Sequence, residues 1–264
     1  MRPLEGKVAL ISGTGGGQGR AAALAFARDG ARVMGCDVKA EDARETVRLV
    51  QGAGGTMRSL EPLDVSDPEQ AEQWVNAAIA EWGGIDILYN NAGSLHARRP
   101  FGESTLEEWD LTIRYELTIV YVCCRAAWPH LVRRGEGVII NTASVSGHFE
   151  LLPLRTAAHG ATKAGVMGLT RMLCAEGAQY GIRAVSVSPG LIRSPSTERF
   201  WTGNDAERAT GAAIAAKIPA GRPGACEEIA EVAAFLASSR ASYINGADVL
   251  VDGGLKSVSF SPLL

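Results

Sequence analysis

The chain has 264 residues, of which 46% are hydrophobic and 21% charged, and its formal net charge is −3 at pH 7. This composition is ordinary for a globular protein, and the acidic balance argues against a nucleic-acid or anionic-membrane partner. No apolar run reaches the roughly 18 residues of a membrane span, and the first residues turn polar too early for a signal peptide. We therefore expect a cytoplasmic protein. The five cysteines fit no metal-ligand spacing, so we expect them to be packed in the core and expect no metal.

Short apolar segments alternate with longer helical patterns along almost the whole chain. In chain order we expect a strand at 7–12, a helix at 18–29, a strand at 32–36, a helix at 41–51, a weak strand at 56–61, a helix at 68–82, a strand at 85–89, a helical stretch at 106–134, a strand at 138–142, a helix at 156–180, a strand at 182–187, a helix at 227–238 and a strand at 249–251. The helix from 68 has the best-marked start, because Asp67 is a typical N-cap and Pro68 suits a first turn.

This alternation predicts an α/β protein with a doubly wound, parallel, seven-stranded sheet of the Rossmann type between two helical layers. In such a sheet the ligand crevice lies at the carboxyl ends of the strands. We see no linker, repeat or low-complexity tract, so residues 1–264 are expected to form a single domain. The less regular segment at about 194–224 is expected to be a lid over the substrate.

A glycine-rich turn joins the first strand to the first helix. Residues 13–19 read Gly-Thr-Gly-Gly-Gly-Gln-Gly, and from Gly17 the sequence satisfies the G-x-G-x-x-G/A pattern of dinucleotide-binding turns. Glycines let the backbone approach a pyrophosphate closely, and the free N–H groups of the following helix attract its charge. A flexible loop is the alternative, but the position between a strand and a helix favours a phosphate cradle at Gly13, Gly17, Gln18 and Gly19.

Asp37 ends the second strand, where a carboxylate can accept hydrogen bonds from an adenosine ribose and repels a 2′-phosphate. The glycine turn contains no Arg or Lys that would attract such a phosphate, although Lys39 is close. The residues therefore favour NAD(H) over NADP(H).

With these motifs placed, the sequence resembles the short-chain dehydrogenase/reductase family over about residues 5–255. The resemblance rests on the glycine turn, the Asp-Val pair at 64–65, Asn-Asn-Ala-Gly at 90–93, Ser-Pro-Gly at 188–190 and Val-Asp-Gly-Gly at 251–254. Besides the turn and Asp37, it assigns cofactor contacts to Asp64, Val65, Asn91, Ala92, Gly93, Lys163, Pro189, Gly190, Ile192 and Ser194.

The resemblance also implies a catalytic Asn, Ser, Tyr and Lys, and two of the four residues differ here. Ser144 and Lys163 are present at the matching positions, but His159 stands four residues before Lys163, where the family has tyrosine. No tyrosine lies between Ser144 and Lys163, so no shift of the alignment restores it. Glu116 stands where the asparagine is expected.

The two replacements are chemically coherent. Residues i and i+4 share a helix face, so His159 and Lys163 point into one cleft. An unperturbed imidazole titrates near pH 6.5, whereas phenol needs help because its pKa is about 10, so histidine is a competent acid or base near neutral pH. A Lys163 cation would disfavour imidazolium, while a Glu116 carboxylate would favour it and could also pair with the lysine. The alternative is that His159 only fills space.

The leading hypothesis is an NAD(H)-dependent oxidoreductase that interconverts a secondary alcohol and a ketone, with His159 as proton carrier. A second is a non-redox lyase, dehydratase, isomerase or hydrolase that uses His159 and Glu116 on the same scaffold. A third is a catalytically silent NAD(H)-binding protein. His148 follows the Ser144 segment, and we interpret it as a solvated loop residue rather than part of the substrate mouth.

The substrate is expected to be a mostly apolar small molecule. The apolar lid residues could face it, or could equally pack the lid against the body; they are Phe200, Trp201, Ile214 and Ile218. The opposite wall is expected at Leu151, Leu152 and Leu154. The resemblance implies a homotetramer, or a dimer, assembled through the helices near 106–134 and 156–180. These helices carry surplus apolar residues, including Val120, Val122, Met167 and Met172.

Overall fold

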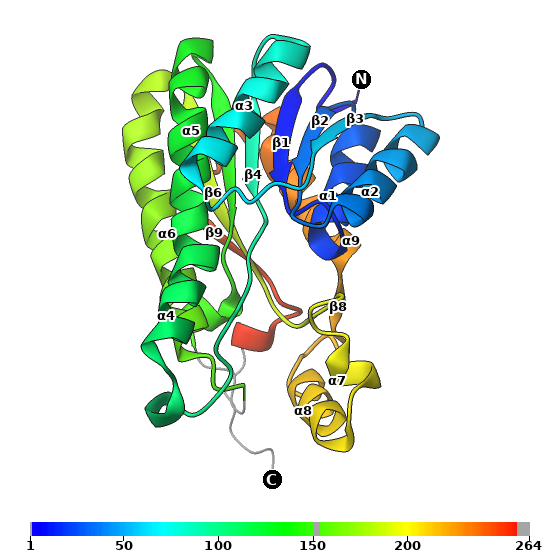
Figure 1. Cartoon of the computed structure of the whole chain (residues 1–264), viewed down its shortest axis with the longest axis vertical. Coiled ribbons are helices and arrows are strands. Elements are labelled where there is room, and N and C mark those ends of the chain that lie inside the picture. The colour runs from blue at the N-terminus through cyan, green and yellow to red at the C-terminus, as the bar shows by residue number, and fades with distance from the viewer. Residues whose placement is uncertain (1, 150–153, 258–264) are drawn as a thin grey trace.

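The computed structural model describes residues 2–149 and 154–257 and shows one parallel sheet between two layers of helices (Figure 1). The order of its seven strands is β3-β2-β1-β4-β5-β6-β9. The strands are β1 (Val8–Ser12), β2 (Arg32–Cys36), β3 (Thr56–Leu60), β4 (Ile87–Asn90), β5 (Gly137–Thr142), β6 (Ile182–Pro189) and β9 (Asp248–Val251). The predicted doubly wound, seven-stranded, single-domain architecture is confirmed. The order reverses between β1 and β4, which is where such sheets bind ligands.

Two sets of helices cover the sheet. One face carries α1 (Gly17–Arg28), α2 (Ala40–Gly52) and α9 (Cys226–Ala237), and the other carries α3 (Pro68–Trp82), α5 (Ile119–Arg134) and α6 (Ala157–Gly177). Strand β1 shows why both faces are needed: Ala9 and Ile11 belong to the first core, Val8 and Leu10 to the second. Side chains alternate along a strand, so a continuous apolar run must be covered from both sides.

The start of α3 follows the predicted capping pattern. Oδ1 of Asp67 accepts hydrogen bonds from the backbone N–H groups of Glu69 (2.9 Å) and Gln70 (3.0 Å), and Pro68 occupies the first turn. Such a cap contributes about 1 kcal/mol to stability. The helix ends at Trp82 and is followed by Gly83, whose φ of 80° is left-handed.

Several predicted elements differ from the structure in their bounds, among them the helix expected at 156–180, which ends at Gly177. The fourth strand begins at Ile87 rather than at residue 85. The expected helical stretch 106–134 divides into α4 (Leu106–Ile113), a π-helical turn (Arg114–Thr118) and α5. A π turn adds a residue to the helical repeat, so it changes which side chains face the sheet, and such turns are frequent at functional sites.

The segment expected to be irregular contains two helices, α7 (Arg199–Thr202) and α8 (Asp205–Ala215). It is entered and left through a two-stranded pair, β7 (Ile192–Arg193) and β8 (Gly224–Ala225). Because it follows the carboxyl end of β6, it stands at the end of the sheet where the crevice is expected (Figure 1). Within the described ranges, none of the helices combines the length and hydrophobicity that crossing a bilayer requires.

Candidate active site

The turn between β1 and α1 has a shape that only glycine allows. Gly13 and Gly17 have left-handed φ angles of 73° and 51°. A Cβ on Gly19 would lie 1.9 Å from the carbonyl oxygen of Gly13, which backbone atoms cannot accommodate. The glycines therefore hold a tight turn with the first N–H groups of α1 free of side-chain caps, as an anion cradle requires.

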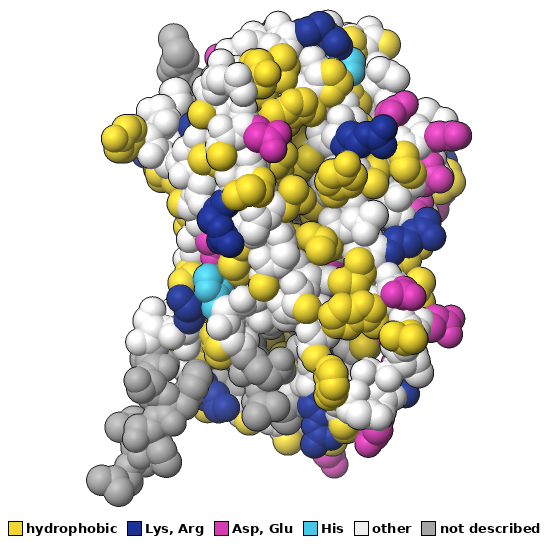
Figure 2. Space-filling view, turned by 90° about the vertical axis from the view of Figure 1, so that its left-hand side faces the viewer, with side chains coloured by type: hydrophobic (Ala, Val, Ile, Leu, Met, Phe, Trp, Pro, Cys, Tyr) yellow, Lys and Arg dark blue, Asp and Glu magenta, His cyan; other side chains and the backbone are white. Residues whose placement is uncertain are grey.

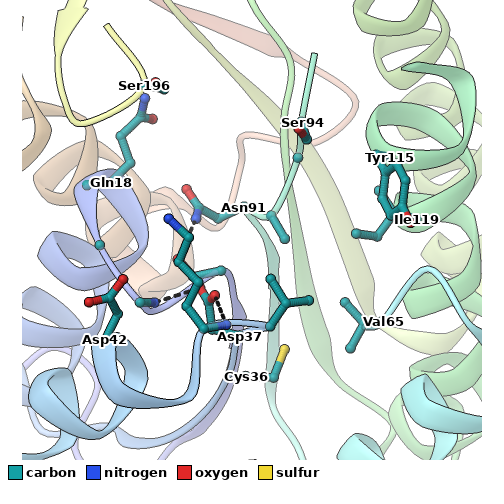
Figure 3. A pocket seen from close by; sticks show the side chains of 18 of the residues that line it. Gln18, Cys36, Asp37, Asp42, Val65, Asn91, Ser94, Tyr115, Ile119 and Ser196 are labelled. Carbon is teal, nitrogen blue, oxygen red and sulfur yellow. Dashed lines mark hydrogen bonds between the residues drawn. The ribbon is translucent and has the colours of Figure 1, made fainter. Parts of the chain in front are cut away.

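A cavity of about 880 Å³ opens from this turn along the carboxyl ends of the strands (Figure 3). Its size suits a dinucleotide. The predicted cofactor residues that line it are Gly13, Gly17, Gln18, Asp37, Asp64, Val65, Asn91, Ala92, Gly93 and Ser194. Five other predicted contacts are not part of the lining: Gly19, Lys163, Pro189, Gly190 and Ile192. Gly19 instead shapes the turn from behind, as its contact with Gly13 shows.

Asp37 is fixed at the β2 end of the cavity. Its Oδ2 accepts the Gly15 N–H at 2.8 Å and its Oδ1 accepts the Lys39 N–H at 2.9 Å. Each carboxylate oxygen has a second lone pair, so the side chain can still accept from a ribose hydroxyl. Asp42 lines the same end, together with Arg20 and Lys39, so this end carries two carboxylates and two cations.

Sequence reasoning missed Arg20, whose side chain also reaches this end of the cavity. The guanidinium donates to the carbonyl oxygen of Gly15 at 2.7 Å, and its Nε donates to Thr46 Oγ1 at 2.9 Å. Arg20 therefore braces the cradle from α1. Its position just after the glycine turn was the only signal in the sequence.

The far end of the cavity lies at Thr142, the last residue of β5. Its backbone carbonyl accepts from Lys163 Nζ at 2.9 Å. Its hydroxyl oxygen is buried, and the Tyr89 hydroxyl lies close to it. Lys163 itself is buried, and burial lowers the pKa of its ammonium group, an effect that the Glu116 carboxylate opposes.

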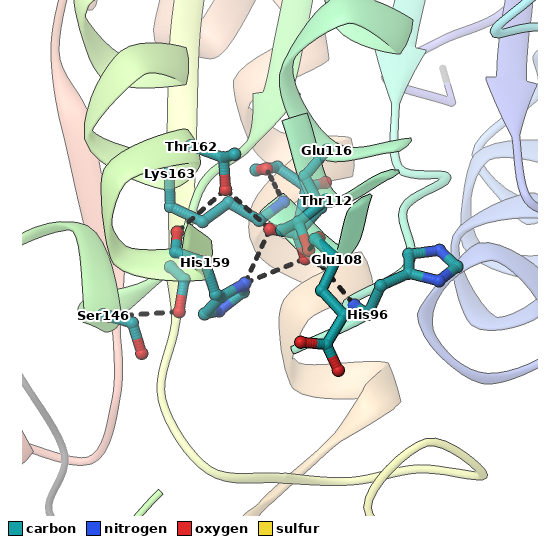
Figure 4. A network of polar contacts seen from close by, with 10 residues as sticks. His96, Glu108, Thr112, Glu116, Ser146, His159, Thr162 and Lys163 are labelled. Carbon is teal, nitrogen blue, oxygen red and sulfur yellow. Dashed lines mark hydrogen bonds and ion pairs between the residues drawn. The ribbon is translucent and has the colours of Figure 1, made fainter. Parts of the chain in front are cut away.

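Glu116 pairs with His159 (Figure 4). Glu116 lies in the π-helical turn, and both of its carboxylate oxygens are 2.8 Å from His159 Nδ1. Glu116 is 4% exposed and His159 19%. Burial alone would raise the pKa of Glu116, but the charge of Lys163 and hydrogen bonds from His159 and Thr162 outweigh it and lower this pKa.

An ionised carboxylate only accepts hydrogen bonds, so Nδ1 of His159 must carry a proton. The neutral ring then has its lone pair on Nε2. The sequence left open whether Glu116 would pair with the histidine or the lysine. In the structure the hydrogen bonds go to His159, while Lys163 acts on Glu116 through its charge.

Ser144 begins a short turn that packs on α6. Ser144 Oγ accepts the Ser146 N–H at 3.1 Å and so starts the short turn Val145–Gly147. A Cβ on Gly160 would be 3.0 Å from the Ser146 carbonyl oxygen. The turn that begins at Ser144 thus packs closely on the first turns of α6, which carry His159 and Lys163.

His148 is held more firmly than the solvated loop residue that the sequence suggested. Its Nε2 lies 2.7 Å from Oδ2 of Asp248 at the start of β9. The other carboxylate oxygen accepts the hydroxyl groups of Ser186 (2.5 Å) and Ser188 (2.9 Å) on β6. The turn that follows Ser144 is thereby tied to the sheet.

The lid packs on the body through its own apolar cluster. Phe200, Ile214 and Ile218 are buried with Val145 and Leu191. Of the two roles that the sequence left open, packing the lid is therefore the one seen for these three residues. Trp201 and Leu154 are partly buried against the same cluster. Leu151 and Leu152 lie outside the described residues.

Comparison with known proteins agrees with this architecture. A family model described as enoyl-(acyl carrier protein) reductase matches residues 13–256. The chain is 36% identical over 251 residues to D-threitol dehydrogenase of Mycolicibacterium smegmatis, covering 95% of this chain and 93% of the relative. It is 39% identical over 256 residues to 3beta-hydroxysteroid dehydrogenase 1 of Eggerthella lenta, covering 96% and 94%.

Solved structures agree as well. A short-chain type dehydrogenase/reductase from Mycobacterium marinum matches with a TM-score of 0.89 at 34% identity, over 97% of each chain. A structure from Agrobacterium tumefaciens with bound NADP matches with a TM-score of 0.86 at 34% identity, over 98% of this chain and all of the other.

Proposed function

The chain belongs to the short-chain dehydrogenase/reductase family of oxidoreductases, and we propose that it interconverts a secondary alcohol and a ketone with NAD(H), using His159 as the proton carrier. The observation that carries this proposal is the bond between Glu116 and His159 Nδ1. It fixes the ring tautomer, so that Nε2 of the neutral ring is a base.

In the direction of alcohol oxidation, the substrate hydroxyl proton passes to Nε2 of His159. The carboxylate of Glu116 stabilises the imidazolium that forms, in the way that carboxylates orient and stabilise catalytic histidines elsewhere. The hydroxyl group of Ser144 donates a hydrogen bond to the substrate oxygen. A bound nicotinamide supplies the hydride chemistry. In the reverse direction the imidazolium returns its proton to the ketone oxygen.

Residues at both ends of the cavity would hold the cofactor. The free N–H groups at the start of α1 suit the pyrophosphate, Asp37 suits the adenosine ribose, and Lys163 and Thr142 suit the nicotinamide ribose side. We favour NAD(H) because Asp37 stands at the end of β2, where a carboxylate suits the ribose hydroxyl groups and repels a 2′-phosphate. The relative with bound NADP shows that the fold also accepts the phosphorylated form, so this preference needs its own test.

We propose a mostly apolar small-molecule substrate, a proposal that Phe200, Ile214 and Ile218 do not carry because they pack the lid against the body. The two curated relatives are named for a polyol and for a steroid, which share a hydroxyl group to be oxidised. The relatives therefore support the hydroxyl group of the proposed substrate more than they support the rest of its structure.

We further propose a homotetramer, with a dimer as the alternative. Figure 2 shows hydrophobic side chains spread over the side of the molecule where α5 and α6 lie. Tyr121 and Met172 are 54% and 58% exposed on these helices, and apolar residues of this kind on a helix surface suit contacts between subunits. Three residues expected to contribute, Val120, Val122 and Met167, are buried in the core instead.

The experiment is an NAD⁺ reduction assay with a panel of secondary alcohols that includes cyclohexanol, threitol and a 3β-hydroxysteroid. NADH should form in step with ketone. His159→Phe should lower kcat by about 10²-fold or more, and the paired change His159→Tyr with Glu116→Asn, which restores the residues common in the family, should recover part of it. Unchanged turnover in His159→Phe would remove this histidine from the mechanism.

A second function is favoured by the same pair. A buried carboxylate and an imidazole can act as acid and base without net redox change, as in a lyase, dehydratase, isomerase or hydrolase. In that case product would form without stoichiometric NADH. If NAD⁺ binds and no substrate turns over, the result favours the third hypothesis, a catalytically silent NAD(H)-binding protein.

A further inference from the structure

Thr162 is a buried residue next to the proposed acid–base pair. It follows His159 by three residues on α6 and precedes Lys163, and its side chain is fully buried. Its hydroxyl oxygen lies 2.6 Å from Oε2 of Glu116 and 2.9 Å from the carbonyl oxygen of His159 (Figure 4). The hydroxyl has one proton for these two acceptors.

The chemistry of the site decides which acceptor receives the proton. The charge of Lys163 and the bonds from its neighbours keep Glu116 ionised, and hydrogen bonds to a charged acceptor are shorter and about twice as strong as neutral ones. The shorter of the two distances is the one to Glu116. The Thr162 hydroxyl therefore donates to the carboxylate.

This bond limits how Glu116 can move. Its carboxylate is bonded to Nδ1 of His159 and also interacts with the charge of Lys163, and either group could attract it. With Oε2 held by Thr162 from the same helical turn as His159, the carboxylate stays on the histidine side. The tautomer of His159 then depends on a hydroxyl that itself touches neither substrate nor cofactor.

We propose that Thr162 is a positioning residue, which holds Glu116 against His159 and so keeps the Nε2 atom of His159 available as the proton-accepting base. The inference rests on the proposed function, because it assigns Thr162 a role in that proton transfer. It differs from a packing role, since a valine of nearly the same shape would fill the space without donating.

Thr162→Val and Thr162→Ser separate the two roles. In Thr162→Val, kcat should fall at least about tenfold with KM nearly unchanged, because the variant loses a hydrogen bond to the charged carboxylate that stabilises the imidazolium. Thr162→Ser, which keeps the hydroxyl, should stay within about twofold of wild type by the same argument. Thr170→Val is the matched control, since Thr170 is a buried threonine on the same helix whose hydroxyl bonds to Asn141 and Val166.

A second readout does not depend on turnover. In protein with ¹⁵N-labelled histidine, NMR should show a slowly exchanging Nδ1 proton on His159 in wild type, Thr162→Ser and Thr170→Val, and fast exchange in Thr162→Val. If wild type turns over no alcohol but Thr162→Val loses this signal, the proposed function fails, while the finding that Thr162 holds Glu116 against His159 stands. An unchanged signal and an unchanged kcat in Thr162→Val overturn the positioning role. It is also overturned if Thr162→Val keeps the signal and only loses as much thermal stability as Thr170→Val does.

Discussion

Both carboxylate oxygens of Glu116 lie 2.8 Å from Nδ1 of His159, although the two residues are 43 positions apart in the chain. The π-helical turn brings the carboxylate to this place, and the first turns of α6 bring the imidazole. The pairing makes Glu116 the residue whose removal is most informative.

Glu116→Gln should separate the charge of the carboxylate from its shape. The amide oxygen can still accept from Nδ1, but a neutral group stabilises imidazolium much less, so we expect kcat to fall by about 10²-fold or more. Steady-state kinetics at saturating NAD⁺ measures this. Glu107→Gln, on an exposed part of α4, is the control and should behave as wild type.

The same variant should change the stability of the protein in acid. The pKa of Glu116 is lowered in the folded state, so its ionised form contributes stability above the pKa of the unfolded chain, about 4.3, and that contribution is lost as the pH falls below it. Wild type should therefore lose more unfolding free energy than Glu116→Gln between neutral pH and the acid range. Urea titrations at several pH values measure the difference. Parallel curves for the two proteins would contradict the lowered pKa.

Asp37→Asn should shift the coenzyme preference toward NADP(H). The change removes the negative charge but keeps one oxygen that can accept the Gly15 N–H. We expect the ratio of the NADP⁺ and NAD⁺ dissociation constants to fall at least tenfold, or about 1.4 kcal/mol. Isothermal titration calorimetry with each coenzyme gives this ratio. Equal ratios in the two proteins would mean that Asp37 does not select the coenzyme.

Gly19→Ala should abolish the phosphate cradle. Its new Cβ would meet the Gly13 carbonyl oxygen at 1.9 Å, so the turn must open. Coenzyme affinity should fall at least tenfold, by about 1.4 kcal/mol or more. Gly52→Ala, where an added Cβ meets nothing within 4 Å, is the control, and binding should be unaffected there. Retained affinity in Gly19→Ala would show that the turn does not bind the pyrophosphate.

Asp248→Asn should loosen the turn that follows Ser144. The carboxylate accepts from His148, Ser186 and Ser188, and an amide cannot accept at its nitrogen. We expect a loss of about 1–3 kcal/mol in unfolding free energy, because a donor is left unpaired in a mostly buried place. Denaturant unfolding measures this. Asp205→Asn changes a carboxylate that is 97% exposed, and its effect should be within about 0.5 kcal/mol.

The sequence by itself determined the features that depend on neighbours in the chain. The order of strands and helices follows from apolar periodicity, and the cap at Asp67 follows from one residue and the next few N–H groups. The glycine turn is also local, because a missing Cβ permits backbone angles that other residues avoid. The spacing of His159 and Lys163 is local too, because residues four positions apart share one face of a helix.

Only the tertiary structure decided which groups meet across the chain. Glu116 bonds to His159 rather than to Lys163, Thr162 approaches the same carboxylate, and Phe200 packs the lid against the body, and each of these contacts joins distant segments. A sequence pattern gives the chemical type of such residues but not the distance between them. That distance depends on how the helices pack and on which rotamers the packed core allows.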